Sequence, residues 1–204
     1  MAGKKPKLLK TVEGGQVYEG FIFKLKNVRL SYAHIAEPKA GTDDNGNPTK
    51  PSFSVTSIMP KDTHDGIKQE LEKAFTQLKA QNKNIKIAKD KLCLRDGDDS
   101  DKDEYAGSWT VSAREKKRPK CRDVNAELIE GTDEIAEELY SGCYADVVIK
   151  LWLQDNSWGK RINANLSAVR KVRDGEPFGE GAVDDDDMYD DVDSGSGFDE
   201  DDDI

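Results

Sequence analysis

Two segments of this chain alternate between apolar and polar residues with the period of a β-strand. In residues 143–153 every odd position is apolar, whereas the even positions include Tyr144, Lys150 and Trp152. Residues 159–172 repeat the alternation after a short polar turn, so the two segments are expected to pair as a hairpin. The residues of the second segment expected to point inward are Ile162, Ala164, Leu166 and Ala168. Because successive side chains of a strand point to opposite faces, one face of this hairpin is predicted to join a core and the other to face outward.

The remaining regular segments predict more strands than helices. Aromatic and β-branched alternation predicts further strands, whereas an apolar stripe at helical spacing predicts one main helix at residues 61–83. The additional strands are expected at residues 17–35, 52–59 and 105–113, and a short second helix at residues 133–142. A phase change at Asn27 indicates either a bulge or two strands. Five or six strands without β-α-β alternation predict a mainly β fold with minor α content, a small antiparallel barrel.

Charge divides the chain into parts of opposite sign. Residues 180–204 contain 13 acidic side chains and no lysine or arginine, so the rest of the chain holds 28 of the 41 acids against all 31 bases, a net charge of +3. We therefore expect a flexible basic arm at residues 1–15, a folded domain at residues 16–179 and a disordered acidic tail at residues 180–204.

Enzymatic function is not expected. The aspartates between Asp96 and Glu104 are spaced like metal ligands, but a calcium-binding EF-hand loop starting at Asp96 needs glycine at its sixth position and glutamate at its twelfth, where this chain has Asp101 and Gly107. No phosphate-binding loop, dinucleotide-binding glycine motif or zinc-ligand spacing is present. We expect no cofactor and no metal site. A metal-dependent nuclease using the Asp96–Glu104 carboxylates is the less favoured alternative.

The outward face of the predicted hairpin combines aromatic rings with cations. Bases stack on aromatic rings and phosphates attract lysine and arginine, which is the combination that single-stranded nucleic-acid binding requires. Trp109 lies on the apolar face of its strand and is expected to pack in the core. The candidate DNA-binding residues come from the hairpin and from a basic loop that precedes it: Tyr144, Lys150, Trp152, Trp158, Lys160 and Arg161, with Arg114, Lys116, Lys117, Arg118, Lys120 and Arg122.

The acidic tail resembles a short nucleic acid in its charge. Tethered to its own domain, it is predicted to compete with DNA for the basic surface at a high effective concentration, and once displaced to bind a protein partner. A solubilising tail without a partner is the alternative. The candidate partner-binding residues of the tail are Asp184, Asp185, Asp186, Asp187, Phe198, Asp201, Asp202, Asp203 and Ile204.

Several stretches resemble one known family. They are LKNVRLSYAHIAEPKA, LRDGD, DEYAGSWTVSA, RPKCRD, YSGCYADVVIKLW and DGEPFG, and they span most of the predicted domain. Together with the acidic end, they resemble the single-stranded DNA-binding proteins of tailed bacteriophages. The resemblance implies a five-stranded OB-fold barrel that coats single strands during phage replication and recombination. It also implies a tail that contacts replication proteins such as a polymerase or helicase, and action in the cytoplasm of the infected bacterial host.

The sequence leaves other partners open. An acidic interaction protein or DNA mimic would bind basic proteins and not DNA, and RNA or double-stranded DNA would use the same stacking and phosphate contacts as single-stranded DNA. The sequence does not fix the oligomeric state, and a homodimer is one of the states it allows. Three isolated cysteines fit a reducing compartment. No membrane association is expected, because no apolar run approaches the roughly 20 residues of a membrane helix.

Overall fold

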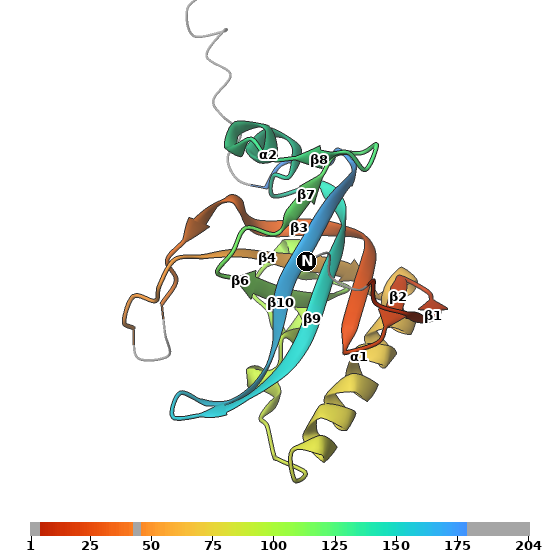
Figure 1. Cartoon of the computed structure of the whole chain (residues 1–204), viewed down its shortest axis with the longest axis vertical. Helices are drawn as coiled ribbons and strands as arrows, with labels where there is room; N and C mark the ends of the chain where they lie inside the picture. The colour runs from red at the N-terminus through yellow and green to blue at the C-terminus, as the bar shows by residue number, and fades with distance from the viewer. Residues whose placement is uncertain (1–4, 43–45, 179–204) are drawn as a thin grey trace, which may run out of the picture.

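Five strands hydrogen-bond in a closed ring in the computed structural model, which describes residues 5–42 and 46–178 (Figure 1). The ring runs β3, β4, β6, β10, β9 and back to β3, and only the contact between β6 and β10 is parallel. This closed barrel with two helices confirms the predicted mainly β, OB-fold-like class. The bounds of the five strands are β3 Ile22–Lys39, β4 Ser52–Pro60, β6 Ser108–Glu115, β9 Tyr144–Asn156 and β10 Gly159–Arg173.

Two bulges allow β3 to serve both sides of the ring. Its first half pairs with β9 and its second half with β4. The register shifts between Leu25 and Val28, where Asn27 adopts a φ of 52°, so the phase change in the sequence is a bulge within one strand. A second shift, between Ser31 and His34, has Tyr32 at a φ of 48°. Bulges increase local twist and bend a strand, which lets one long strand turn the corner of the barrel.

The alternation in the hairpin strands determines the core. The odd positions of β9 through Leu151 are buried, and Leu153 is half-buried near the hairpin end. In β10, Ile162, Ala164 and Leu166 are buried as expected. The expectation that Ala168 also points inward is wrong, because the register shifts between Leu166 and Ala168 and Val169 is the buried residue instead.

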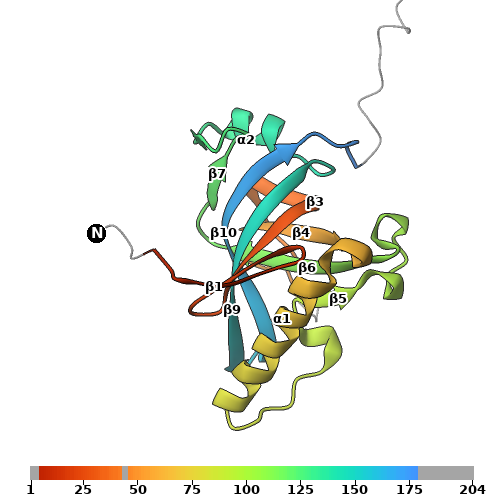
Figure 2. The same ribbon diagram turned by 90° about the vertical axis from the view of Figure 1, so that its right-hand side faces the viewer.

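The helix α1 (Lys61–Gln81) follows β4 in the chain and packs against the barrel (Figure 2). Its buried stripe includes Ile67, Leu71 and Phe75, as its apolar spacing predicts. The smaller elements are β5 Leu94–Asp96, β7 Lys120–Arg122, β8 Leu128–Ile129, α2 Thr132–Glu138 and the one-turn helices Lys89–Lys91, Gly97–Asp99 and Asp103–Tyr105. Neither α-helix in the described residues has the length and apolarity needed to cross a bilayer.

The segment expected to be a flexible basic arm is partly a hairpin. Residues 8–12 form β1 (Leu8–Val12), which pairs with β2 (Gly15–Tyr18), and β2 continues onto β3. The hairpin turn contacts α1, since the Ile67 N–H donates to the Glu13 carbonyl at 2.9 Å and Lys10 pairs with Glu70 at 2.7 Å. These contacts tie the arm to the domain from Leu8 onward.

A short segment after β10 folds back over one end of the barrel. Arg29 donates from Nη2 to the Glu176 carbonyl at 2.7 Å, and its guanidinium lies 4.0 Å from the ring centroid of Phe178. The Phe178 N–H donates to the Ser141 carbonyl at 2.9 Å. The predicted acidic tail at residues 180–204 lies outside the described residues, the last of which is Phe178.

One buried carboxylate links three strands of the barrel. Asp146 on β9 accepts from the Asn27 N–H at 3.0 Å and pairs with Lys24 on β3 at 3.1 Å and with Arg170 on β10 at 2.7 Å. Burial alone would raise the pKa of Asp146. The hydrogen bonds from Asn27, Lys24 and Arg170, together with the charge of Lys24, outweigh burial and hold the pKa below its ordinary value. The carboxylate therefore stays ionised and joins the bulge of β3 to the hairpin.

We predict that Asp146→Asn lowers the free energy of unfolding by about 3 kcal/mol at pH 7, because it removes one partner of a buried ion pair. Since the folded-state pKa is depressed, this contribution is present above the unfolded-state pKa and is lost as pH falls through the folded-state value. Urea unfolding should therefore show the two proteins converging only below about pH 4. Asp155→Asn, on the exposed part of the same hairpin, is the control and should change stability by less than about 0.5 kcal/mol. A constant difference between Asp146→Asn and wild type across this range would contradict the assignment.

Candidate nucleic-acid interface

Strand register places residues from four strands in one row across the outer surface of the barrel. Ser54 on β4 pairs with Arg114 on β6, Arg114 with Asn165 on β10, and Asn165 with Lys150 on β9. We call these four residues the cross-strand row. It joins the start of the basic loop to the hairpin, although they are far apart in sequence. Two of the predicted DNA-binding cations, Arg114 and Lys150, are thus brought to either side of a single asparagine.

The indole of Trp152 is held in place beside this row. Its Nε1–H donates to the side-chain oxygen of Asn165 at 2.7 Å, and the side chain remains 40% exposed. Because the polar edge of the ring already has its partner, the exposed ring can receive an apolar or aromatic surface without leaving a donor unsatisfied. Trp152 is therefore a preorganised stacking position with a cation on either side of its anchor.

The end of the hairpin supplies a second exposed ring. Trp158 is 73% exposed, and its backbone N–H donates to the Asn156 side chain at 2.9 Å. Lys160 is exposed nearby on β10, whereas Arg161 is half-buried. In Figure 1 the hairpin end and the connection between β3 and β4 project on the same side of the barrel. In OB-folds these two connections flank the face that binds oligonucleotides.

Two cations of the basic loop are anchored by hydrogen bonds to neighbouring segments. Arg118 donates to the Ala36 carbonyl at 2.8 Å, to the Thr132 hydroxyl at 2.9 Å and to the Glu130 carbonyl at 3.1 Å, and Arg122 donates to the Ala126 carbonyl at 2.7 Å. These two arginines therefore hold the loop in place. The other predicted cations, Arg114, Lys116, Lys117 and Lys120, have exposed side chains.

Tyr144 lies away from the cross-strand row. It is at the opposite end of β9, and the guanidinium of Arg173 stacks 3.3 Å from its ring centroid. Gly175 packs so close to the ring that a Cβ there would meet it at 2.9 Å. The structure therefore separates Tyr144 from Trp152 and covers its ring with this chain's own residues.

The sequence does not single out Ser54, Thr56 and Ser112, the small polar residues of β4 and β6 that we call the floor. Apart from Arg114, the outward residues along the middle of β4 and β6 are small and polar, and the hydroxyls of Thr56 and Ser112 lie 3.1 Å apart across the two strands. Such side chains leave room for a ligand close to the sheet. The signal was present in the alternation of serine and threonine in residues 52–57 and 108–112, but it lacks the charge or aromaticity that marks a binding residue.

The acidic loop is engaged in structural contacts. Lys61 pairs with Asp96 and with Asp98, each at 2.6 Å, and Asp98 also accepts from the Gly107 N–H at 2.6 Å. Within residues 5–42 and 46–178, no group of three or more histidine, cysteine or acidic side chains is arranged to hold a metal ion.

Trp109 packs against the core beneath Lys61, whose Nζ lies 4.3 Å from the ring centroid.

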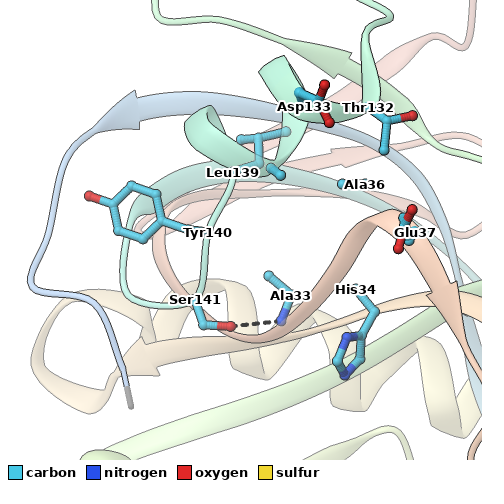
Figure 3. Close-up of a pocket in the computed structure, with 10 residues that line it drawn as sticks. Ala33, His34, Ala36, Glu37, Thr132, Asp133, Leu139, Tyr140 and Ser141 are labelled. Carbon is cyan, nitrogen blue, oxygen red and sulfur yellow. Dashed lines mark hydrogen bonds between the residues drawn. The ribbon is translucent and has the colours of Figure 1, made fainter. Parts of the chain in front are cut away.

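An open groove of about 500 Å³ lies between α2 and β3 (Figure 3). Its wall includes Ala33 and Leu139, the Ser141 hydroxyl accepts from the Ala33 N–H at 2.9 Å, and Glu37 and Asp133 also line it. Two carboxylates at this groove disfavour a phosphate backbone, so the nucleic-acid candidate remains the surface around the cross-strand row.

Comparison with known proteins gives consistent matches. The family described as Enterobacter phage Enc34, ssDNA-binding protein, matches residues 22–202. "Putative protein p50" of Acyrthosiphon pisum secondary endosymbiont phage 1 is 31% identical over 185 residues, which cover 83% of this chain and 92% of that protein. The structure of the single-stranded DNA-binding protein from bacteriophage Enc34 in complex with ssDNA has a TM-score of 0.80 and 41% identity, and covers 87% of this chain and 100% of that chain. Another structure of the Enc34 protein has a TM-score of 0.79 and 42% identity, and covers 92% and 100%.

We predict that Arg118 and Lys117 differ in their effect on stability. Arg118→Ala should lower the free energy of unfolding by about 1–2 kcal/mol, because it removes a charged donor from three oxygens that remain partly exposed to water. Lys117→Ala should change it by less than about 0.5 kcal/mol. Thermal and urea unfolding of the two variants measure this difference directly, and equal effects would show that Arg118 does not anchor the loop.

Proposed function

Because this chain belongs to the family of the single-stranded DNA-binding protein of Enterobacter phage Enc34, we propose that it binds single-stranded DNA without sequence preference during phage DNA replication and recombination. The family consists of DNA-binding proteins and not of enzymes. The observation that carries the proposal is the cross-strand row, in which Arg114 and Lys150 flank the asparagine that holds Trp152.

The geometry supports stacking combined with phosphate neutralisation. A base placed on Trp152 would have its adjoining phosphates within reach of Lys150 and Arg114, and Trp158 with Lys160 would extend the same arrangement along the hairpin. Every base offers a π-face, so stacking on these rings is tolerant of sequence. Long cationic side chains follow the backbone and carry no base information. Both contacts therefore favour binding that is independent of sequence.

The acidic tail is proposed to compete with DNA for this surface. Phe178, the last described residue, is held against Arg29 and Ser141 at one end of the barrel. The 26 residues that follow span at most about 90 Å when extended, whereas a domain of this size has a radius of gyration of about 15 Å. The tail is thus long enough to reach the cross-strand row. Its acids, including Asp184–Asp187 and Asp201–Asp203, would occupy the cations until a strand of higher charge density replaces them.

The displaced tail is proposed to bind replication proteins such as a polymerase or helicase in the cytoplasm of the infected bacterial host. Its apolar residues Phe198 and Ile204 would add specificity to a contact that charge alone leaves unspecific. A homodimer would pair two such domains, and sedimentation velocity of the purified protein tests that state. Single- and double-stranded DNA and RNA of equal length, titrated in parallel, distinguish the nucleic acids that share these contacts.

We predict that substitutions of Trp152 and of the cations in the cross-strand row weaken binding in two distinct ways. Trp152→Ala should reduce affinity for a fluorescent single-stranded oligonucleotide by about 1–3 kcal/mol, or roughly 5- to 150-fold. Lys150→Gln and Arg114→Gln should each reduce the slope of log affinity against log salt by about 0.7. Lys73→Gln, on the outer part of α1 where Lys73 pairs with Glu70 at 2.8 Å, is the control and should leave both quantities unchanged. Wild-type affinity in Trp152→Ala, Lys150→Gln and Arg114→Gln alike would refute this surface as the DNA site.

We predict that deleting residues 180–204 tightens binding of single-stranded DNA at low salt, because it removes an intramolecular competitor. The gain should shrink as salt screens the tail's charges. A full-length variant with every tail aspartate and glutamate replaced by asparagine and glutamine controls for chain length, and should bind as tightly as the deletion. Weaker binding by the deletion at low salt would contradict the competition.

A further inference from the structure

Tyr32 is exposed by a bulge that a tyrosine does not readily adopt. It lies where the register of β3 shifts between Ser31 and His34, and its φ of 48° is in the left-handed region. Bulky residues are uncommon there, and such conformations persist where the surrounding structure enforces them. The side chain is nevertheless 49% exposed. The bulge therefore presents an aromatic ring to solvent instead of directing it into the core.

The ring is fixed by a cation from a different loop. Lys102 donates from Nζ to the Tyr32 hydroxyl, and its Nζ lies 4.7 Å from the centroid of the ring. Beside this pair, the Tyr105 hydroxyl lies 3.2 Å from the Ser31 hydroxyl in a buried contact. Tyr105 follows Lys102 closely in the chain, so one buried hydrogen bond helps to anchor the loop that carries the cation. An exposed ring and an ammonium group are thus held together.

Strand pairing connects the bulge that carries Tyr32 to the cross-strand row. Ser31, next to Tyr32, pairs with Thr56, and Thr56 pairs with Ser112. Beyond the bulge, His34 pairs with Ser54, the first member of the cross-strand row. The floor of small polar side chains on β4 and β6 therefore lies between Tyr32 on one side and Arg114 on the other. None of the positions paired along this path, Ser54 with Arg114 and Thr56 with Ser112, is acidic. The acidic residues closest to the pair in the chain are Asp101, Asp103 and Glu104, which flank Lys102.

We infer that Tyr32 and Lys102 form a second base-stacking and phosphate-binding position, so that a single strand crosses β4 and β6 between Tyr32 and Trp152. The inference rests on the proposed function and specifies the path of the DNA strand across the barrel. Tyr32 takes a base, Lys102 takes a neighbouring phosphate, and the hydroxyls of Thr56 and Ser112 lie beneath the connecting backbone. Trp152 takes a base at the other end of the same path.

The test compares variants of the full-length protein. Tyr32→Gly removes the ring at a backbone conformation that glycine adopts freely, so its thermal midpoint should not fall. Its affinity for a 20-nucleotide single strand should fall about tenfold or more. Tyr32→Phe keeps the ring and should stay within about threefold of wild type, and Lys102→Gln should lower the salt slope by about 0.7. Leu128→Ala, which truncates a side chain of similar exposure on β8, should bind as wild type does.

A second measurement locates the contact directly. Single strands carrying 5-iododeoxyuridine, irradiated in complex with the wild-type protein, should crosslink to Tyr32 as well as to Trp152. If Tyr32→Gly binds normally and crosslinks fall only on the hairpin, the inference is wrong while the proposed function holds. If the wild-type protein and Trp152→Ala both fail to bind any single strand, the proposed function is wrong, and so is the assignment of Tyr32 and Lys102. If Tyr32→Gly is unstable, the crosslink in the wild-type protein decides.

Discussion

The parallel contact between β6 and β10 is the constraint on which the rest of the surface depends. It is a short contact, with Arg114 opposite Asn165, and it closes the ring that the antiparallel pairs leave open. Because the pairing of β10 with β9 is fixed by the inward alternation of both strands, closing the barrel at this register places Arg114, Asn165 and Lys150 side by side. A shift of one residue would turn the side chains to the other face and separate the basic loop from Trp152.

A small number of structural contacts engage some of the basic side chains of the domain. Asp146 engages Lys24 and Arg170, and Arg118 is directed to the oxygens of neighbouring segments. The exposed lysines and arginines of the loop and the hairpin are therefore a subset of the basic residues, gathered near exposed aromatic rings. A chain with a modest net positive charge over residues 1–179 can in this way present a locally basic path to a polyanion.

The sequence predicted the parts of the fold that depend on local periodicity. The alternation of residues 143–153 identified the inward face of β9 correctly, and the helical stripe identified α1, because both patterns follow from the geometry of one element. Ala168 was placed inward because a bulge changes the phase of β10 without changing the residue types. The hairpin at residues 8–18 was missed because it is held by contacts with α1 and by the pairing of β2 with β3, which local composition does not show.

The candidate site was predictable in its chemistry and less so in its geometry. Trp152, Lys150 and Arg114 were selected from residue type and are brought together by non-local pairing. Tyr144 met the same criteria, but Arg173 covers its ring through a segment that folds back only in three dimensions. Arg118 and Lys117 look equivalent in the sequence, and only the oxygens around Arg118 distinguish them. Tyr32 is presented by a bulge, which no alternation pattern marks in advance.

The central claim is that a single strand lies across the barrel along the cross-strand row. Amide hydrogen exchange, followed residue by residue with and without a saturating single-stranded oligonucleotide, tests it most directly. Added protection should concentrate on β4, β6 and the paired parts of β9 and β10 around Ser54, Arg114, Asn165 and Lys150. Protection confined to α1 and the β1–β2 hairpin, with these four strands unchanged, would contradict the account.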